Sequence, residues 1–293
     1  MRSNTLRNTC FFILTGSLVT LALVIAATWL WFTARPQPAA ANTTLFQGIT
    51  YLRQVRQTPR PMVVHVVTVD LRQEGISFLV TPGEPKAEQP LKARTTSQFL
   101  AEFNLQLAVN GDGATPWYSR NLLDYYPHPG DAVAPIGLAA SRGVVYSQDT
   151  DVEPTLYISR TNRASFNTPT GRIYNAISGN QMLVVRGKPL AGMEDVPQPR
   201  TAVALDKAGR RLILVVVDGR QRNYSEGASL AELAGIIVAH GGYNGMNLDG
   251  GGSTTLVIEG ENGRPEQLNS PIDNQIPGRE RPVGNHLGIY ASR

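Results

Sequence analysis

The sequence is poor in cysteine and in charged residues. Its 293 residues include a single cysteine, Cys10, and only 17% of the side chains are charged. One cysteine excludes an intrachain disulfide, so the fold must depend on its apolar core. Cys10 precedes the first apolar run, which excludes a lipoprotein cleavage site and leaves acylation of this thiol open. The 42% of hydrophobic residues argue against intrinsic disorder, and the glycines lack the triplet period of collagen.

Several common catalytic signatures are also missing. The chain has no G-x-x-x-x-G-K-[ST] phosphate loop and no G-x-S-x-G nucleophile motif. The G-G-x-x-G at 241–245 precedes a predicted strand, which is the wrong context for a dinucleotide site. The histidines lack the close spacing of zinc ligands. They are His65, His128, His240 and His286.

The formal net charge of +4 is unevenly distributed along the chain. Arg2, Arg7 and Arg35 lie before residue 42, where no acid occurs; removing these three from the 27 basic residues leaves 24 against 23 acids. A nearly neutral domain has no summed field to attract a polyanion. We therefore expect no nucleic-acid partner, although a local basic pocket stays open.

Residues 11–32 form an apolar run without charge or proline. As a helix this run would be about 33 Å long, close to the thickness of a bilayer core. The sequence therefore predicts a transmembrane anchor at 11–32, with a cytoplasmic tail at 1–10, a linker at 33–44 and an extracytoplasmic domain at 45–293, in the periplasm or at the cell surface. A signal peptide cleaved near 39–41 is the alternative.

The rest of the chain predicts an α+β fold. Helices are expected at 95–103 and 229–239, the second with a Ser229/Glu232 capping box. Residues 201–219 read as a hairpin that turns at 207–209. Other strands are expected at 62–71, 76–81, 105–113, 155–159, 173–177, 181–186, 244–248 and 254–258. Because strands outnumber helices, we expect a single domain with a mixed or antiparallel sheet, and a long loop at 114–135 is a candidate binding loop.

The densest polar motif lies at 246–260. Asp249 ends an apolar strand and is followed by Gly250, Gly251, Gly252 and Ser253. Three consecutive glycines have a high entropic cost unless the backbone must approach another group closely. Their N–H groups can also converge on an anion. The motif predicts a carboxylate beside an anion-binding loop rather than a simple turn.

Two other strands end in the same way. Asn110, Gly111 and Asp112 follow one strand, and Asp218 follows another. If these ends meet, they form an acidic pocket that could bind sugar hydroxyls or move a proton. The same acids could instead hold Ca²⁺ through oxygen ligands.

Basic residues complete the predicted site. Arg200 and Thr201 precede the hairpin, and Arg281 and Asn285 lie in a segment that ends in Val-Gly-Asn. An arginine beside a glycine loop can bind a phosphate through two N–H groups. We expect these four residues to contribute to a phosphate site.

Segments 199–205, 217–260 and 279–290 resemble the phosphodiester glycosidase family. The similarity covers roughly 100–290 and is densest at 199–290, with 105–113 resembling the N-terminal motif of the family. Where the family often has aromatics after Asn-Gly, this chain continues with Asp112, and Trp117 and Tyr118 are the alternative aromatic surface. The chain after residue 10 has no cysteine, and in this respect it resembles a bacterial-type member of the family.

The resemblance implies hydrolysis of a sugar 1-phosphodiester at the glycosidic carbon. Asp249 is then the first candidate for the catalytic carboxylate, with Asp112 and Asp218 next. The glycine amides, Ser253 and an arginine would bind the phosphate leaving group. The implied partner is a sugar-phosphate glycan or glycolipid of the cell envelope. A phosphodiesterase that cuts the P–O bond and a non-catalytic module for anionic polysaccharide are the alternatives.

Overall fold

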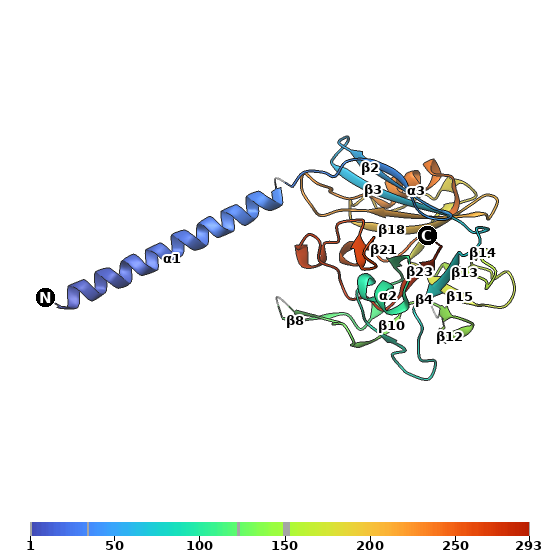
Figure 1. Ribbon diagram of the computed structural model, residues 1–293, viewed down its shortest axis with the longest axis horizontal. Coiled ribbons are helices and arrows are strands. Elements are labelled where there is room, and N and C mark those ends of the chain that lie inside the picture. Colours follow the sequence, from blue (N-terminus) through green and yellow to red (C-terminus); the bar gives the residue numbers. More distant parts are fainter. Residues whose placement is uncertain (1, 34, 122–123, 149–152, 293) are drawn as a thin grey trace.

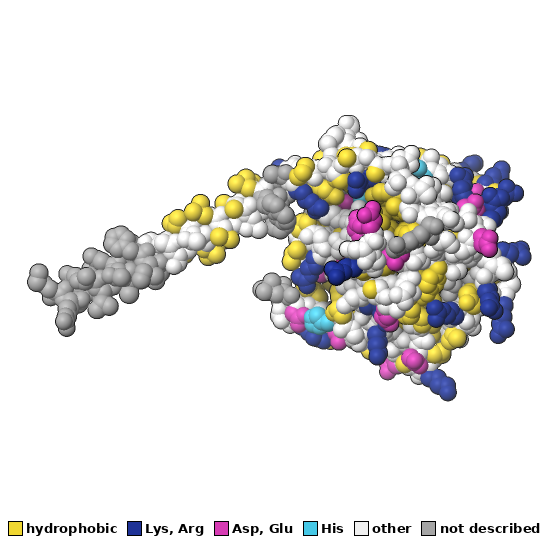
Figure 2. Space-filling view, in the orientation of Figure 1, with side chains coloured by type: hydrophobic (Ala, Val, Ile, Leu, Met, Phe, Trp, Pro, Cys, Tyr) yellow, Lys and Arg dark blue, Asp and Glu magenta, His cyan; other side chains and the backbone are white. Residues whose placement is uncertain are grey.

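The computed structural model describes residues 2–33, 35–121, 124–148 and 153–292. The helix α1 (Arg2–Thr33) extends away from a domain that holds the remaining elements (Figure 1), and its side chains are described for residues 15–30. Figure 2 shows apolar side chains exposed along this part of α1 and Lys and Arg interspersed with Asp and Glu over the domain. No single basic surface dominates the face that is shown.

The largest sheet has eight strands and is antiparallel at every pairing that the structure describes. Its central strands are runs of β-branched residues because both of their faces are buried. In spatial order the strands are β1 (Ala41–Phe46), β2 (Ile49–Arg56), β3 (Met62–Asp70), β19 (Arg211–Val217), β18 (Arg200–Asp206), β20 (Gly242–Asn247), β16 (Gln181–Val185) and β17 (Lys188–Pro189).

Two five-stranded sheets pack against one face of this sheet. The first holds β22 (Pro265–Gln267), β21 (Leu256–Glu259), β6 (Leu107–Asn110), β23 (His286–Tyr290) and β4 (Ser77–Val80). The second holds β12 (Val144–Ser147), β11 (Ala139–Ser141), β15 (Asn175–Ser178), β13 (Thr155–Ile158) and β14 (Ala164–Phe166). Smaller pairings join β5 (Leu91–Lys92) and β7 (Ala114–Thr115) to β10 (Ala132–Pro135), and β8 (Tyr118–Asn121) to β9 (Asp124–Tyr126).

The main apolar core lies between these sheets. Val67 of β3, Val203 of β18, Leu107 of β6, Ile177 of β15 and Leu287 of β23 all contribute fully buried side chains to it. Two helices cover the outer faces: α3 (Leu230–Ala239) packs on the eight-stranded sheet and α2 (Thr96–Phe103) on the sheet of β6. These two sheets are thus covered on both faces, and the candidate site lies where several of their strands end.

The sequence predicted both domain helices well. Ser229 caps α3 and forms a capping box with Glu232, and Thr95 caps α2 in the same way with Gln98. The 201–219 hairpin is β18 and β19, paired in register from Arg200–Val217 to Leu205–Leu212. The expected α+β domain with an antiparallel sheet is confirmed.

The predicted transmembrane anchor at 11–32 is not confirmed. The range falls within α1, yet among the described residues no helix is both long enough and apolar enough to cross a membrane. The predicted linker at 33–44 lies against the domain where it is described. Arg35 Nη1 donates to Gln221 Oε1 at 2.8 Å and lies over the ring of Tyr224, 4.3 Å from its centroid, and β1 begins at Ala41.

Candidate active site

The site forms where strands of two sheets end. β6 lies antiparallel between β21 and β23 in its sheet, so the segment that leaves β6 lies beside the segments that enter β21 and β23. β20, in the eight-stranded sheet, leads into the Asp249 loop, and the Asp249 amide donates to the Gly111 carbonyl at 3.0 Å. Two of the three predicted acidic strand ends, those of Asp249 and Asp112, are thus brought together.

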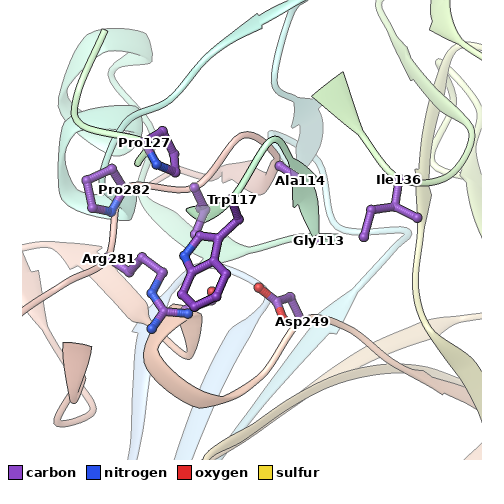
Figure 3. Close-up of a pocket in the computed structure, with 10 residues that line it drawn as sticks. Gly113, Ala114, Trp117, Pro127, Ile136, Asp249, Arg281 and Pro282 are labelled. Carbon is purple, nitrogen blue, oxygen red and sulfur yellow. The ribbon is translucent and has the colours of Figure 1, made fainter. Parts of the chain in front are cut away.

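A hollow of about 270 Å³ opens at this junction, and we call it the inner hollow. Its size is near the lower end of pockets that hold small ligands, about 300–1,000 Å³. Figure 3 shows the Trp117 indole and the Arg281 guanidinium beside the Asp249 carboxylate. The lining residues are Gly113, Ala114, Trp117, Pro127, Ile136, Asp249, Ser253, Arg281, Pro282 and Val283.

Asp249 supplies the carboxylate of the inner hollow. The Gly250 N–H donates to its Oδ1 at 2.9 Å, and the Ser253 hydroxyl also bonds to it. Burial raises the pKa of Asp249 above its usual range, opposed by these bonds and by the charges of Arg281 and Arg220. A carboxylate with a raised pKa, open to a pocket and beside cations, is suited to proton transfer or to attack on an electron-poor carbon.

Asp112 lies behind the wall of the inner hollow and is 2% exposed. Its two oxygens accept the N–H groups of Gly113 at 2.7 Å and Gly137 at 2.9 Å. Burial raises the pKa of Asp112 to about 7, with further contributions from the nearby Glu153 and Asp249. Asp112 therefore holds two lining segments together and does not itself line the pocket.

The raised pKa of Asp112 predicts how stability depends on pH. The unfolded chain releases this proton near its ordinary pKa of 3.8 and the folded chain at about 7, so the folded state holds more protons in between and stability falls as pH rises across that range. We expect the unfolding temperature to fall between pH 5 and pH 8, and Asp112→Asn to flatten that slope. Differential scanning fluorimetry over this range measures it; equal slopes in the two proteins would contradict the assignment.

Several of the predicted binding residues hold the Asp249 loop in place and do not line the pocket. The Asn110 side chain donates to the Asp249 carbonyl at 2.7 Å and accepts from the Thr201 hydroxyl at 2.8 Å. The Gly111 N–H donates to the Asn285 carbonyl at 2.9 Å. All of these side chains are buried, so they fix the Asp249 loop against β18 and β23 without facing a ligand.

Two of the three glycine amides in the predicted anion nest already have partners within the protein. The Gly250 amide donates to Asp249 and the Gly251 amide to the Pro199 carbonyl at 2.9 Å, so both are already used. The glycines instead make room for guanidinium groups. A Cβ at Gly252 would lie 2.4 Å from Arg281 Nη2, and a Cβ at Gly251, which has φ +62°, would lie 3.1 Å from Arg220 Nη2. The predicted close approach is correct, but its partners are arginines.

Arg281 is the arginine that faces the inner hollow. Its Nε donates to Asp273 Oδ1 at 2.8 Å, and its guanidinium lies 5.5 Å from the centroid of the Trp117 ring. Arg200, the other predicted clamp, points away: its Nη2 donates to the Val196 carbonyl at 2.8 Å and pairs with Glu194 at 3.4 Å. Burial lowers the pKa of Arg200.

The sequence reasoning missed Arg220. Its Nε donates to the neutral Gln198 side chain at 2.7 Å, and its pKa is lowered by burial and by the neighbouring charges of Arg281 and Arg200. Cations gathered this closely create a positive potential that favours an anion. The signal was present in the sequence, since Arg220 follows Asp218 and Gly219 directly at a strand end.

A second cavity, which we call the outer hollow, adjoins the first and measures about 560 Å³. Trp117 and Arg281 form walls of both hollows. Trp117 stacks on Tyr125 with the ring centroids 5.8 Å apart, whereas Tyr118 stacks on Tyr126 instead. Of the two expected aromatics, only Trp117 lines the hollows. The outer lining is Trp117, Tyr125, Arg220, Ile272, Asn274, Gln275, Ile276, Arg279 and Arg281.

A family model described as phosphodiester glycosidase matches residues 103–290, more than half of the chain. The chain belongs to the phosphodiester glycosidase family. A curated bovine relative, N-acetylglucosamine-1-phosphodiester alpha-N-acetylglucosaminidase, is 41% identical over 66 residues, which are 22% of this chain and only 12% of the bovine protein. The match to this phosphodiester glycosidase relative is therefore local.

Two solved structures share the fold of this phosphodiester glycosidase domain. The catalytic domain of the zebrafish enzyme of the same name has a TM-score of 0.57 at 23% identity, covering 87% of this chain and 84% of that one. A hypothetical protein from Synechocystis also has a TM-score of 0.57, at 16% identity, covering 87% of this chain and 64% of that one. At these identities the structures show a common fold alone.

Asp218, predicted as a third site acid of this phosphodiester glycosidase domain, lies outside both hollows. It is fully buried and accepts from His65 Nε2 at 3.0 Å, Asn269 Nδ2 at 3.1 Å and the Ser270 amide at 2.8 Å. The Tyr51 hydroxyl contacts His65 Nδ1 at 2.8 Å. Asn269 also donates to the Thr254 carbonyl at 3.1 Å, so this buried network supports the far end of the glycine loop.

Asp218→Asn should therefore act on stability. The asparagine amide has an NH₂ donor where the aspartate has an acceptor oxygen. This donor would face groups that themselves donate to Asp218, so a hydrogen bond is lost. We expect the free energy of unfolding to fall by about 3 kcal/mol. Urea denaturation measures the loss, and activity per folded molecule reports on function. A loss of turnover in protein that is as stable as wild type would restore Asp218 to the catalytic set.

The structure offers no support for the Ca²⁺ alternative in the residues it describes. Among them, no group of three or more His, Cys, Asp or Glu side chains is arranged to hold a metal ion. Asp249 and Asp112 are neighbours, but the oxygens of Asp112 face backbone amides. Measuring activity with and without a chelator tests whether calcium is required.

Proposed function

We propose that this domain hydrolyses the glycosidic C–O bond of a sugar 1-phosphodiester and releases a free sugar and a phosphomonoester. The observation that carries the proposal is the Asp249 carboxylate, with its raised pKa, in one pocket with Arg281. Membership in the phosphodiester glycosidase family supports the same reaction. The bovine and zebrafish relatives suggest N-acetylglucosamine as the first sugar to test.

In this proposal each part of the substrate has its own position in the site. The sugar occupies the inner hollow, where Trp117 offers an aromatic face and Ala114, Ile136 and Val283 offer apolar walls. The phosphate lies at Arg281, which can donate two N–H groups to its oxygens. This arrangement puts the anomeric carbon beside Asp249.

In the reaction, water supplies the oxygen that replaces the phosphate on the anomeric carbon. The C–O bond breaks and its electron pair stays on the phosphate oxygen, where Arg281 stabilises the charge that develops. A phosphomonoester needs little protonation to leave. The pocket therefore depends mainly on one carboxylate that acts as base or nucleophile, and less on an acid that protonates the leaving group. Asp249 takes the proton of the attacking water directly, or first forms a covalent intermediate that water then opens.

A product analysis tests the proposal. The protein is incubated with 1-phosphodiesters of N-acetylglucosamine, glucose, mannose and galactose, each esterified to glycerol, with and without a chelator. Free sugar and glycerol phosphate, with oxygen from isotopically labelled water found in the sugar, support the proposal, whereas label in the phosphate would show cleavage of the P–O bond. NMR of the first anomer formed separates the two routes. Sugar phosphate and glycerol would instead show a phosphodiesterase. Binding without products would show a non-catalytic module, and loss of activity with chelator that calcium restores would show a metal requirement.

We also propose, from the sequence alone, that the domain acts outside the cytoplasm. Arg2 and Arg7 precede an uncharged run, a pattern typical of exported proteins. Its substrate would then be a glycan or glycolipid of the cell envelope. A reporter fused after residue 293 tests this: alkaline phosphatase activity in the fusion supports export, and a reporter active only in the cytoplasm contradicts it.

A further inference from the structure

The outer hollow has a different character from the inner one. Arg220, Arg279 and Arg281 line it, and no acid occurs among its described lining residues. Asp273, which is not part of this lining, pairs with both Arg279 at 3.3 Å and Arg281 at 2.8 Å, so one negative charge is shared between two guanidinium groups. Arg220 bonds to the neutral Gln198 and interacts with the charge of Asp249, so the three arginines still outnumber these two acids.

The position of the outer hollow assigns its occupant. The two hollows share only Trp117 and Arg281, and the phosphate of the proposed substrate lies at Arg281. With the sugar in the inner hollow, the group on the other side of the phosphate must extend into the outer one. The outer hollow, at about 560 Å³, is also the larger of the two.

We propose that the alcohol component of the substrate carries a second phosphate, which the outer hollow binds through Arg279 and Arg220. This inference rests on the proposed function and specifies its substrate class: a sugar 1-phosphodiester whose leaving group is itself phosphorylated, as in a chain of repeating phosphodiesters. Arginine suits this role because its planar fork matches a phosphate. Tyr125 and Ile276 provide an apolar wall for the carbon skeleton between the two phosphates.

The test compares two substrates with one sugar, the one released fastest in the panel above. The first is its 1-phosphodiester with glycerol, and the second is its 1-phosphodiester with glycerol 3-phosphate. We expect kcat/KM to be at least tenfold higher for the second, mainly through a lower KM. The preference should shrink as salt is added, because partly exposed charges are screened.

Arg279→Gln is the decisive variant, since Arg279 lines the outer hollow and not the inner one. We expect the ratio of the two kcat/KM values to fall toward one. Arg72→Gln is the matched control, because Arg72 also pairs with one aspartate, Asp70, at 3.3 Å and lies outside both hollows. The wild-type ratio should persist in this control.

The outcomes separate the two proposals. If neither substrate releases sugar, the proposed function fails. If wild type hydrolyses both substrates with equal kcat/KM, the function stands and the second-phosphate inference is overturned. A preference that survives in Arg279→Gln, or that disappears equally in Arg72→Gln, would also overturn the assignment to the outer hollow.

Discussion

Replacing Asp249 by Asn should lower kcat about 10³-fold or more while the domain stays folded. In the proposed function the carboxylate lies beside the anomeric carbon, and the amide can neither take a proton from water nor attack carbon. The bonds that fix the loop, from Asn110 Nδ2 to the Asp249 carbonyl and from the Asp249 amide to Gly111, involve backbone atoms and survive the change. Steady-state kinetics on the most active panel substrate measures the effect.

Two further variants make this result interpretable. The asparagine in Asp249→Asn would directly precede Gly250, and Asn-Gly pairs deamidate to restore a carboxylate, so Asp249→Ala should be measured beside it on fresh protein. Asp206→Asn is the matched control, because Asp206 also ends a strand and also accepts backbone N–H groups, from Arg210 and Arg211. Turnover near that of wild type in Asp249→Ala would end the assignment.

Replacing Arg281 by Gln should lower kcat/KM about 100-fold or more. In the proposed reaction Arg281 stabilises the charge of the leaving phosphate, and removing one such donor from an active site costs about 10²–10³ in rate. Arg281→Lys should be intermediate, because it keeps the charge and loses the two-pronged geometry. Inorganic phosphate should also inhibit both variants less than it inhibits wild type.

Arg94→Gln provides a close control for Arg281. Arg94 pairs with Glu102 at 2.9 Å and lies 5.8 Å from the Phe103 ring centroid, much as Arg281 pairs with Asp273 and lies over Trp117. Because Arg94 is outside both hollows, its loss should change stability but not phosphate inhibition. An Arg281→Gln protein with unchanged phosphate inhibition would place the leaving group elsewhere.

The local structure of the domain could be predicted from sequence because its signals are local. The Ser229/Glu232 capping box and the apolar spacing of α3 lie within eleven residues, and β18 and β19 are joined by a short turn. The Asp249 motif could be found for the same reason: a carboxylate, three glycines and a hydroxyl occur side by side. These patterns depend on neighbours in the chain and not on the tertiary fold.

The composition of the site could be predicted only in part, because it depends on which strand ends meet. Asp218 has the same local pattern as Asp249, yet its side chain faces His65 and Asn269 in a buried network. The outer hollow depends on the loop that holds Asn274 and Gln275, both at positive φ, which no periodicity indicates. The anchor prediction depended on hydropathy over 11–32, and the helix found there did not bear it out.

The hairpin of β8 and β9 forms a two-stranded sheet of its own, and residues on and beside it line both hollows. Trp117, directly before β8, and Tyr125 of β9 line the hollows from this side, whereas Asp249 follows β20 of the eight-stranded sheet. In the proposed function, the aromatic contact to the substrate and the catalytic carboxylate thus come from separate elements. Exchanging residues 117–125 should change the sugar preference while leaving Asp249 and Arg281 in place, which makes this segment a natural unit for engineering.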